Sequence, residues 1–307
     1  MSGYQTIAST APQAPKRRTW TTWTGKQILT GIMILFLIYF LLPFSWLVFS
    51  SSKPNADLFT SFGLWFTKDF NLFGNLGLLF TYNNGIYLTW LWNTFYYSLV
   101  SATGAALLAT MAGYAFAKFR FAGRQISYYL ILSSVLVPTT SLVIPIYFLM
   151  SKLQILNTPL AIILPSIVSP FGVYLMRIYI DGAVPDEILD SARIDGAGEF
   201  RIFGTISLRL VMPGFITVFL LAFVGTWNNY FLPLVVLSNP QYYPLTLGLA
   251  SWNAQASNAG GGAGGGTSEL FTLVITGALV SITLLSLAFL FLQRYWQSGL
   301  SLGGVKQ

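Results

Sequence analysis

The chain has 307 residues, of which 54% are hydrophobic and 8% are charged, and its mean hydropathy is +0.65. A soluble domain usually carries about 25% charged residues, so this composition indicates an integral membrane protein. The formal net charge of +7 suits basic cytoplasmic loops better than a nucleic-acid surface, and we expect no nucleic-acid partner. Cysteine and histidine are both absent, which excludes disulfides, thiolate chemistry, zinc sites and histidine acid–base catalysis.

Six apolar segments are long enough to cross a bilayer, because about 20 apolar residues span its hydrocarbon core. The expected spans are residues 28–49, 91–117, 127–151, 159–180, 213–237 and 270–292. All six should be helices, since backbone polar groups in lipid must pair within their own segment, and the fold class is therefore all-α. Six prolines inside these spans predict kinks or broken turns: Pro43, Pro138, Pro145, Pro165, Pro170 and Pro233.

Basic residues set the expected orientation, because cytoplasmic loops carry an excess of lysine and arginine. An inside N-terminus places most of them in the cytoplasm: Lys16, Arg17, Arg18, Lys26, Lys118, Arg120, Arg124, Arg177, Arg193, Arg201, Arg209, Arg294 and Lys306. Only Lys53, Lys68 and Lys152 would then lie outside. We therefore expect both ends of the chain to be cytoplasmic.

This topology divides the chain into a cytoplasmic tail (1–27), a six-span membrane domain (28–292) and a second cytoplasmic tail (293–307). The polar first tail shows no cleavable signal, because the apolar segment after it is too long. Residues 50–90 form a long outer segment that is expected to be partly ordered. The outer loop 254–268, AQASNAGGGAGGGTS, has the composition of a flexible linker. Its glycines do not make a phosphate loop, since no GK[ST] follows them.

The spans carry almost no charge, which bears on how transport would be driven. A proton-coupled carrier needs acidic or histidine relays at membrane depth. Spans one to five contain no candidate, and Glu269 lies only at the outer edge of span six. Sodium coupling through carbonyls and hydroxyls is disfavoured but stays open. The chain has no nucleotide motif, so energy for uphill transport should enter from another polypeptide through the cytoplasmic loop 181–213.

That loop contains the sequence DEILDSARIDGAGEF (186–200), which predicts two short helices. Pro185 should lie at the start of the first helix, and acids in its first turn complement the helix dipole. Gly196 is expected to end it in a left-handed cap. A second helix from Glu199 to Val211 would carry one apolar stripe. Small residues here (Ser191, Ala192, Gly196 and Ala197) would let a partner approach the backbone, as in helix-in-groove docking. An amphipathic loop that merely lies at the membrane surface fits the pattern equally well.

At this loop the sequence resembles the permeases of binding-protein-dependent ABC importers. Their signature is E-A-A, three residues, a glycine, and later a hydrophobic stretch that ends in proline. Asp190, Ser191 and Ala192 stand at the E-A-A positions, which is a departure at the first two. The D-G-A of Asp195 to Ala197, then EFRIF (199–203) and Pro213, follow in order.

The resemblance extends over nearly the whole chain and is greatest to the second permease subunit of the maltose-type carbohydrate family. It is carried by AFAKFRFAGR (115–124), LVPTTSLVIPIYFLMSKLQILNT (136–158), FVGTWNNYFLPLVVLSNPQYYPLTLGL (223–249) and GLSLGGVK (299–306). The family's L-P-L run is changed here, since Arg209 stands between two leucines.

The resemblance implies a non-enzymatic subunit of a carbohydrate importer in the bacterial cytoplasmic membrane, with oligosaccharides as the expected substrate class. The implied partners are a second permease, two cytoplasmic ATPases that bind ATP and magnesium, an outer solute-binding protein and the lipid bilayer. No cofactor is expected in this chain. The residues expected to couple to the ATPase are Glu187, Asp190, Ser191, Ala192, Asp195, Gly196, Ala197, Phe200 and Pro213. Asp190, Asp195 and Glu199 could alternatively fix the fold of the loop itself.

Candidate residues for the substrate path are Asn228, Asn229 and Tyr230, late in span five, and Tyr147 in span three. Amides and aromatic rings bind sugars, but interface anchoring and helix–helix hydrogen bonding explain such residues as well. Two functions from other classes stay open at this point: an ion-coupled secondary carrier, and a membrane scaffold or sensor.

Overall fold

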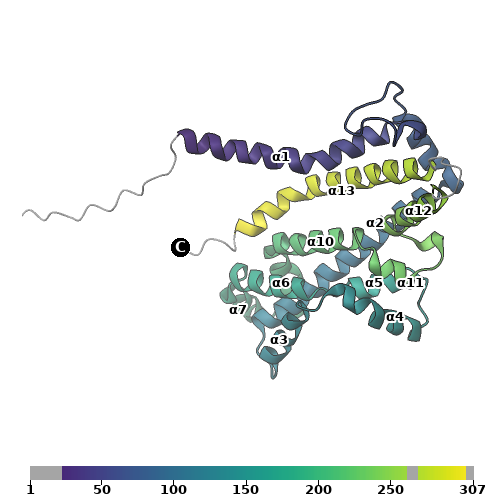
Figure 1. Cartoon of the computed structure of the whole chain (residues 1–307). Coiled ribbons are helices and arrows are strands. Elements are labelled where there is room, and N and C mark those ends of the chain that lie inside the picture. The colour runs from purple at the N-terminus through teal and green to yellow at the C-terminus, as the bar shows by residue number, and fades with distance from the viewer. Residues whose placement is uncertain (1–22, 261–268, 302–307) are drawn as a thin grey trace, which may run out of the picture. The chain divides into compact units, whose positions relative to one another are not determined.

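The computed structural model describes residues 23–260 and 269–301, and every regular element in this part of the chain is a helix (Figure 1). In chain order these are α1 (Trp23–Ser51), η1 (Asn55–Asp57), α2 (Leu72–Lys118), α3 (Arg124–Ser134), η2 (Thr139–Leu142), α4 (Val143–Lys152), α5 (Leu160–Ser166), α6 (Pro170–Ala183), α7 (Asp186–Ile194), α8 (Glu199–Ile202), the π-helix η3 (Phe203–Ser207), α9 (Leu208–Leu210), α10 (Met212–Trp227), α11 (Phe231–Val236), η4 (Pro240–Tyr242), α12 (Leu245–Gly260) and α13 (Glu269–Ser301). The all-α prediction is confirmed for this part of the chain.

The chain divides into two compact units, residues 1–46 and 47–307. In the first unit the described residues are a single apolar helix, the start of α1, whose side chains from residue 26 to 44 are all exposed. Pro43 does not interrupt it. A helix that is apolar on every side is typical of a membrane span.

In the part of the chain that the structure describes, four helices are long and apolar enough to span a membrane. They are 25–51, 72–118, 160–183 and 269–291. Two bent pairs bring the number to six if each pair is one span: 124–152, bent by 98° between α3 and η2, and 199–227, bent by 80° before α10. The six predicted spans are consistent with this set. The bend in the first pair comes directly before Pro138, which cannot continue a helix.

Helix α2 is the central element of the second unit, because it packs against α6, α10, α12 and α13 (Figure 1). Its small residues allow this close packing, as in many membrane helix pairs. A Cβ on Gly113 would lie 2.8 Å from Met176 Cβ and 2.9 Å from Arg177 N, so the backbones of α2 and α6 are nearly in contact there. Two buried clusters follow from this arrangement, one of α2 with α6, α7, α8 and α10, the other of α2 with α10, α12 and α13.

The predicted loops differ from the structure at both outer segments. Helix α2 begins at Leu72, well before the expected start at residue 91, and is broken at Tyr82–Gly85. Asn83 and Asn84 have left-handed backbone angles there (φ 48° and 57°), a conformation that asparagine tolerates. The glycine-rich linker prediction is wrong for residues 254–260, which extend α12 as a helix. Residues 261–268 lie outside the described residues.

A clamp of hydrogen bonds fixes the segment between α11 and α12. Trp90 Nε1 donates to Pro240 O (2.8 Å), and Tyr97 Oη donates to Tyr242 O (3.0 Å). Thr94 Oγ1 accepts from the buried backbone N–H of Leu245 (2.7 Å). Helix α2 thus holds the start of α12 through its side chains.

Candidate functional site

The cytoplasmic loop predicted at 181–213 is built from α7, α8, the π-helix η3 and α9. Val184 is buried at the end of α6, and Pro185, in an extended conformation, is the N-cap of α7. Proline was expected at the first helical position, so the helix starts one residue later than predicted. The second helix is likewise present but not continuous, because η3 interrupts it after Ile202 and it bends at Val211.

Gly196 ends α7 in a left-handed turn, as predicted, with φ of +81°. The Gly196 N–H donates to Arg193 O, and the Ala197 N–H donates to Ala192 O, both at 3.0 Å. This pair of bonds is a Schellman motif, which satisfies carbonyls that the helix end would leave free. A Cβ at Gly196 would meet no atom within 4 Å, so glycine is required there for its backbone angles rather than for space.

Arg193 connects the two helices of the loop through ion pairs. Its Nη1 donates to Asp190 Oδ1 (2.7 Å), while Nε and Nη2 donate to the two carboxylate oxygens of Glu199 (2.7 and 3.3 Å). The two carboxylates raise the pKa of Arg193 above its usual value, chiefly through these hydrogen bonds. Asp190 and Glu199 therefore both pair with Arg193 inside the loop, while a contact of either residue with an ATPase stays a prediction. Asp195 is exposed at the turn.

A further ion pair attaches the loop to α2. Lys118 Nζ lies 2.7 Å from Asp186 Oδ1; the lysine side chain is 7% exposed, whereas the aspartate is largely in solvent. The hydrogen bond from Lys118, and then its charge, lower the pKa of Asp186. The first turn of α7 is thereby fastened to the end of α2.

The loop has one buried face and one exposed face. Leu189, Ala192 and Ile202 pack into the cluster formed with α2, α6 and α10. Ile194 and Phe200, by contrast, are 87% and 90% exposed. Two apolar side chains next to the glycine turn therefore face away from the chain's own core.

The predicted coupling residues separate along these two faces. Glu187, Ser191 and Phe200 are exposed, and Ser191 Oγ donates to the Glu187 carbonyl (2.8 Å). The prediction that Ala192 presents a small docking surface is wrong, because this side chain is buried against its own core; Ala197 is half-buried there too.

Pro213 is the second residue of α10, directly after the bend, which agrees with the expected start of span five at residue 213. Sequence reasoning missed Ile194. The signal was present, since this apolar residue lies five positions after Leu189, off the buried stripe of α7.

The predicted substrate-path residues lie at the break between α10 and α11. Asn228 is exposed, and its Nδ2 donates to Val224 O (3.0 Å). Asn229 is internally bonded, since its Oδ1 accepts from Leu232 N and its carbonyl accepts from Thr246 Oγ1 (2.7 Å). Tyr230 packs beside a buried cluster of α4, α5 and α11.

Tyr147 lies half-buried on α4, which packs against α11. Span three therefore approaches the broken helix that carries the asparagines. Among the described residues, no group of three acidic side chains is placed to hold a metal ion.

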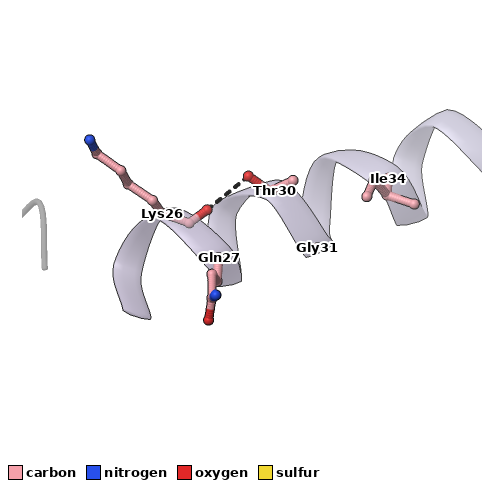
Figure 2. A pocket seen from close by; sticks show the side chains of 5 residues that line it. All are labelled: Lys26, Gln27, Thr30, Gly31 and Ile34. Carbon is pink, nitrogen blue, oxygen red and sulfur yellow. Dashed lines mark hydrogen bonds between the residues drawn. The ribbon is translucent and has the colours of Figure 1, made fainter. Parts of the chain in front are cut away.

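The described surface includes a hollow on α1 and a hollow at the loop. Figure 2 shows the first, lined by Lys26, Gln27, Thr30, Gly31 and Ile34, where Thr30 Oγ1 donates to Lys26 O (2.9 Å). Its lining residues all come from α1, so the described residues of this unit give the hollow no opposing wall that would hold a ligand. The second, of about 180 Å³, lies at the root of the loop and is lined by Met111, Tyr114, Ala115, Phe119, Glu199, Phe200 and Phe203.

Known proteins are similar to this chain in sequence and in fold. The family described as binding-protein-dependent transport system inner membrane component matches residues 105–301. The arabinooligosaccharides transport system permease protein AraQ of Halalkalibacterium halodurans is 34% identical over 85% of this chain and 89% of that protein. The lactose transport system permease protein LacG of Rhizobium radiobacter is 31% identical over 86% of this chain and 90% of that protein.

A solved structure supports the fold independently. One chain in the crystal structure of a bacterial ABC transporter involved in the import of the acidic polysaccharide alginate has a TM-score of 0.77. It is 21% identical and covers 89% of this chain and 97% of that chain. These findings argue against the secondary-carrier hypothesis. The chain belongs to the family of inner membrane components of binding-protein-dependent transport systems, and it is an ABC importer permease.

Proposed function

We propose that the chain forms half of the translocation pore of an ATP-driven carbohydrate importer, and that oligosaccharides are its substrate class. Relatives at 34% and 31% identity are named for transport of arabinooligosaccharides and lactose, and both align over more than 80% of this chain. The partners proposed are a second permease, two cytoplasmic ATPases and an outer solute-binding protein. Both termini lie in the cytoplasm, as the basic residues favour.

The observation that carries the coupling role is the outward presentation of Ile194 and Phe200 by a rigid loop. Exposed apolar side chains on a short, capped helix suit insertion into a groove of a partner. The Schellman turn and the Arg193 ion pairs hold the two side chains in a fixed relation. A rigid loop can transmit a displacement, whereas a flexible loop would absorb it.

The mechanism follows from how the loop is attached. ATP and magnesium act in the partner ATPase, and no step of that chemistry occurs in this chain. Movement of Ile194 and Phe200 with the ATPase displaces α7 and α8 together. The displacement reaches α2 through the Lys118–Asp186 pair and the buried face of Leu189. Helices α2, α6 and α10 then move as a packed body, which opens the pore to one side and closes it to the other.

Asn228 is the residue on the break in span five that we propose for the substrate path, because its side chain is exposed. Asn229 and Tyr230 instead hold the break in shape. Discontinuous membrane helices commonly border transport sites, since irregular backbone at membrane depth is tolerated where it lines a cavity.

The test is purification of the chain in mild detergent with its bound subunits, followed by identification of those subunits by mass spectrometry. We expect an ABC ATPase and a second permease, and reconstituted uptake of an oligosaccharide that requires ATP. The double variant Ile194→Ser/Phe200→Ser should lose uptake and ATPase binding. Leu153→Ser, exposed near the end of α4, is the matched control and should keep both. Uptake by the purified single chain without an ATPase would overturn the proposal.

A further inference from the structure

The segment that follows α1 exposes a row of six aromatic side chains within 15 residues. Their exposed fractions lie between 43% and 78%, and the residues are Phe59, Phe62, Trp65, Phe66, Phe70 and Phe73. We call these residues the aromatic row. Contiguous apolar surface of this kind usually marks contact with a protein or a membrane.

Neighbouring rings join most of the row into one continuous surface that begins on α1. Phe49, in the last turns of α1, contacts the rings of Trp65 (centroids 5.6 Å apart) and Phe66 (4.7 Å). Phe66 in turn contacts Phe70 (5.9 Å), and Phe70 contacts Phe73 (6.4 Å) at the start of α2. The surface therefore runs from the end of one span to the beginning of the helix that continues into the next.

Hydrogen bonds from buried groups hold this segment in place. Lys53 is fully buried, and its Nζ donates to Ser61 Oγ (2.9 Å) and Phe62 O (2.7 Å). Asn75 Nδ2, buried on α2, donates to the carbonyls of Ser51 and Lys53, both at 2.8 Å. Lys53 and Asn75 thus point inward, and the rings are left on the outside. This is the reverse of what a loop in water would favour.

We propose that the aromatic row lies in the headgroup region of the outer leaflet and seats this side of the permease on the lipid bilayer. The segment begins where the apolar helix α1 ends, so chain connectivity places it at the depth of the membrane surface. Phenylalanine and tryptophan are typical of elements that lie in this interface. The two exposed charged residues of the segment, Lys68 and Asp69, have opposite signs, so their charges cancel. Attachment to the bilayer would then come from insertion of the rings rather than from attraction to anionic lipid.

Constant contact with lipid accounts for the exposed rings of the aromatic row better than contact with a protein that binds only transiently. A solute-binding protein docks and leaves in each cycle, and it would return six rings to water each time. Lipid covers them throughout. The assignment to the outer leaflet rests on the orientation given under the proposed function. Contact of the aromatic row with a bilayer surface is argued independently of that orientation.

The absence of cysteine from the sequence allows a direct test with single spin labels. Phe62→Cys and Phe73→Cys would be labelled in the full importer complex, in which the other subunits lack reactive cysteines, and placed in nanodiscs of phosphatidylethanolamine and phosphatidylglycerol. Collision of the label with oxygen reports lipid, and collision with a nickel chelate reports water. Gln241→Cys, exposed on η4, is the control on another outer segment.

We expect the oxygen-to-nickel collision ratio at residues 62 and 73 to exceed that at residue 241 several-fold, with mobile labels. A ratio equal to the control would place the row in water and overturn the proposal. Immobile labels with little access to either reagent would show a protein contact and overturn it too. Phe62 contributes only its backbone carbonyl to the fold of the segment, so its cysteine variant should assemble. ATP-driven uptake, measured on the same samples, separates failure of this proposal from failure of the proposed function.

Discussion

The guanidinium of Arg193 spans the glycine turn and donates two hydrogen bonds to the carboxylate of Glu199, at 2.7 and 3.3 Å. One residue at the end of α7 thereby sets the angle at which α8 begins. Such paired geometry is the directional form of the arginine–carboxylate interaction. The loop is therefore a single two-helix unit rather than two helices on a flexible joint.

Replacing Arg193 with methionine should separate the two helices while leaving the core of the permease unchanged. Exposed ion pairs contribute only about 0.2–1 kcal/mol each, so the unfolding temperature of the complex should change little. ATP-driven uptake should fall several-fold, because no ion pair then joins α7, which carries Ile194, to α8, which carries Phe200. Arg201→Met, an exposed position on α8, is the control. Equal uptake by the Arg193 and Arg201 variants in proteoliposomes would contradict this role.

Gly196 and Gly198 allow the same substitution to be compared in two backbone conformations. Neither position has an atom within 4 Å of an added Cβ, but φ is +81° at Gly196 and −71° at Gly198. Gly196→Ser should cost about 1–2 kcal/mol, since the left-handed region is strained for residues with a Cβ. Gly198→Ser should be neutral or better, because serine is a favoured N-cap. Uptake and unfolding temperature of the two variants test this, and equal effects would count against the Schellman turn as a requirement.

The Lys118–Asp186 pair should make attachment of the loop sensitive to acid. Lys118 lowers the pKa of Asp186 relative to its unfolded value, so the carboxylate stabilises the docked loop above the usual aspartate range of about pH 4. That contribution is lost as the pH falls through the lowered pKa. A spin label at residue 188 should gain mobility in that acid range.

Removing either partner of this pair should have unequal consequences. Asp186→Ala leaves a largely buried lysine without its carboxylate, whereas Lys118→Met replaces it with an apolar side chain of similar length. We expect Asp186→Ala to mobilise the label at neutral pH and Lys118→Met to remove this part of the acid response. A Lys118→Met variant that loosens the loop more than Asp186→Ala would contradict this assignment.

Much of the fold follows from local sequence because the spans and the coupling turn are coded locally. The run of apolar residues in α1 and the proline positions predict helices and breaks, and the D-G-A sequence predicts the left-handed angle at Gly196. The π-helix η3 could not be foreseen, since no residue in FGTIS requires an extra residue per turn. Its first residue makes a tertiary contact, since Phe203 packs on Tyr114 of α2 with ring centroids 5.3 Å apart, and such a contact leaves no pattern in the local sequence.

The errors at the site have the same origin. Ala192 is small whether it faces a partner or its own core, so only the packing of α7 on α2 and α6 decides between the two. The start of α2 was placed too late because residues 72–90 are less apolar than the span, yet Asn75 and Tyr87 hold them to other elements: Tyr87 Oη donates to Gly277 O at 2.8 Å. Contacts across such distances in the chain leave no local pattern.

The near contact of α2 and α6 can be tested with a single methyl group. Gly113→Ala would place a Cβ 2.9 Å from Arg177 N, and the helices would have to separate, at a cost of about 1–3 kcal/mol. Gly225→Ala on α10 adds the same methyl group where nothing lies within 4 Å, so it should be neutral or slightly stabilising. The unfolding temperatures of the two variants in detergent give the comparison. A neutral Gly113→Ala would show that the two helices are not held this closely.

Within the clamp that α2 makes, one hydroxyl binds the first residue of α12. Thr94 Oγ1 receives the buried N–H of Leu245 and itself donates to Trp90 O. Thr94→Val keeps the shape but leaves that N–H without an acceptor, and an unsatisfied buried donor costs about 1–3 kcal/mol. The start of α12 should loosen, with faster hydrogen exchange at Leu245 and lower thermal stability.

Thr103→Val provides the matched control for this change. Thr103 lies on the same helix, is exposed, and donates only to the carbonyl of Leu99 (2.7 Å), so loss of its hydroxyl leaves no buried group unpaired. Hydrogen exchange at Leu245 should therefore stay as in the unmodified chain. Thr103→Val should lose little of the thermal stability that Thr94→Val loses. If exchange at Leu245 rises equally in both, the start of α12 is held by packing of its own Trp252 on Trp90 of α2 (ring centroids 4.6 Å apart) rather than by this hydrogen bond.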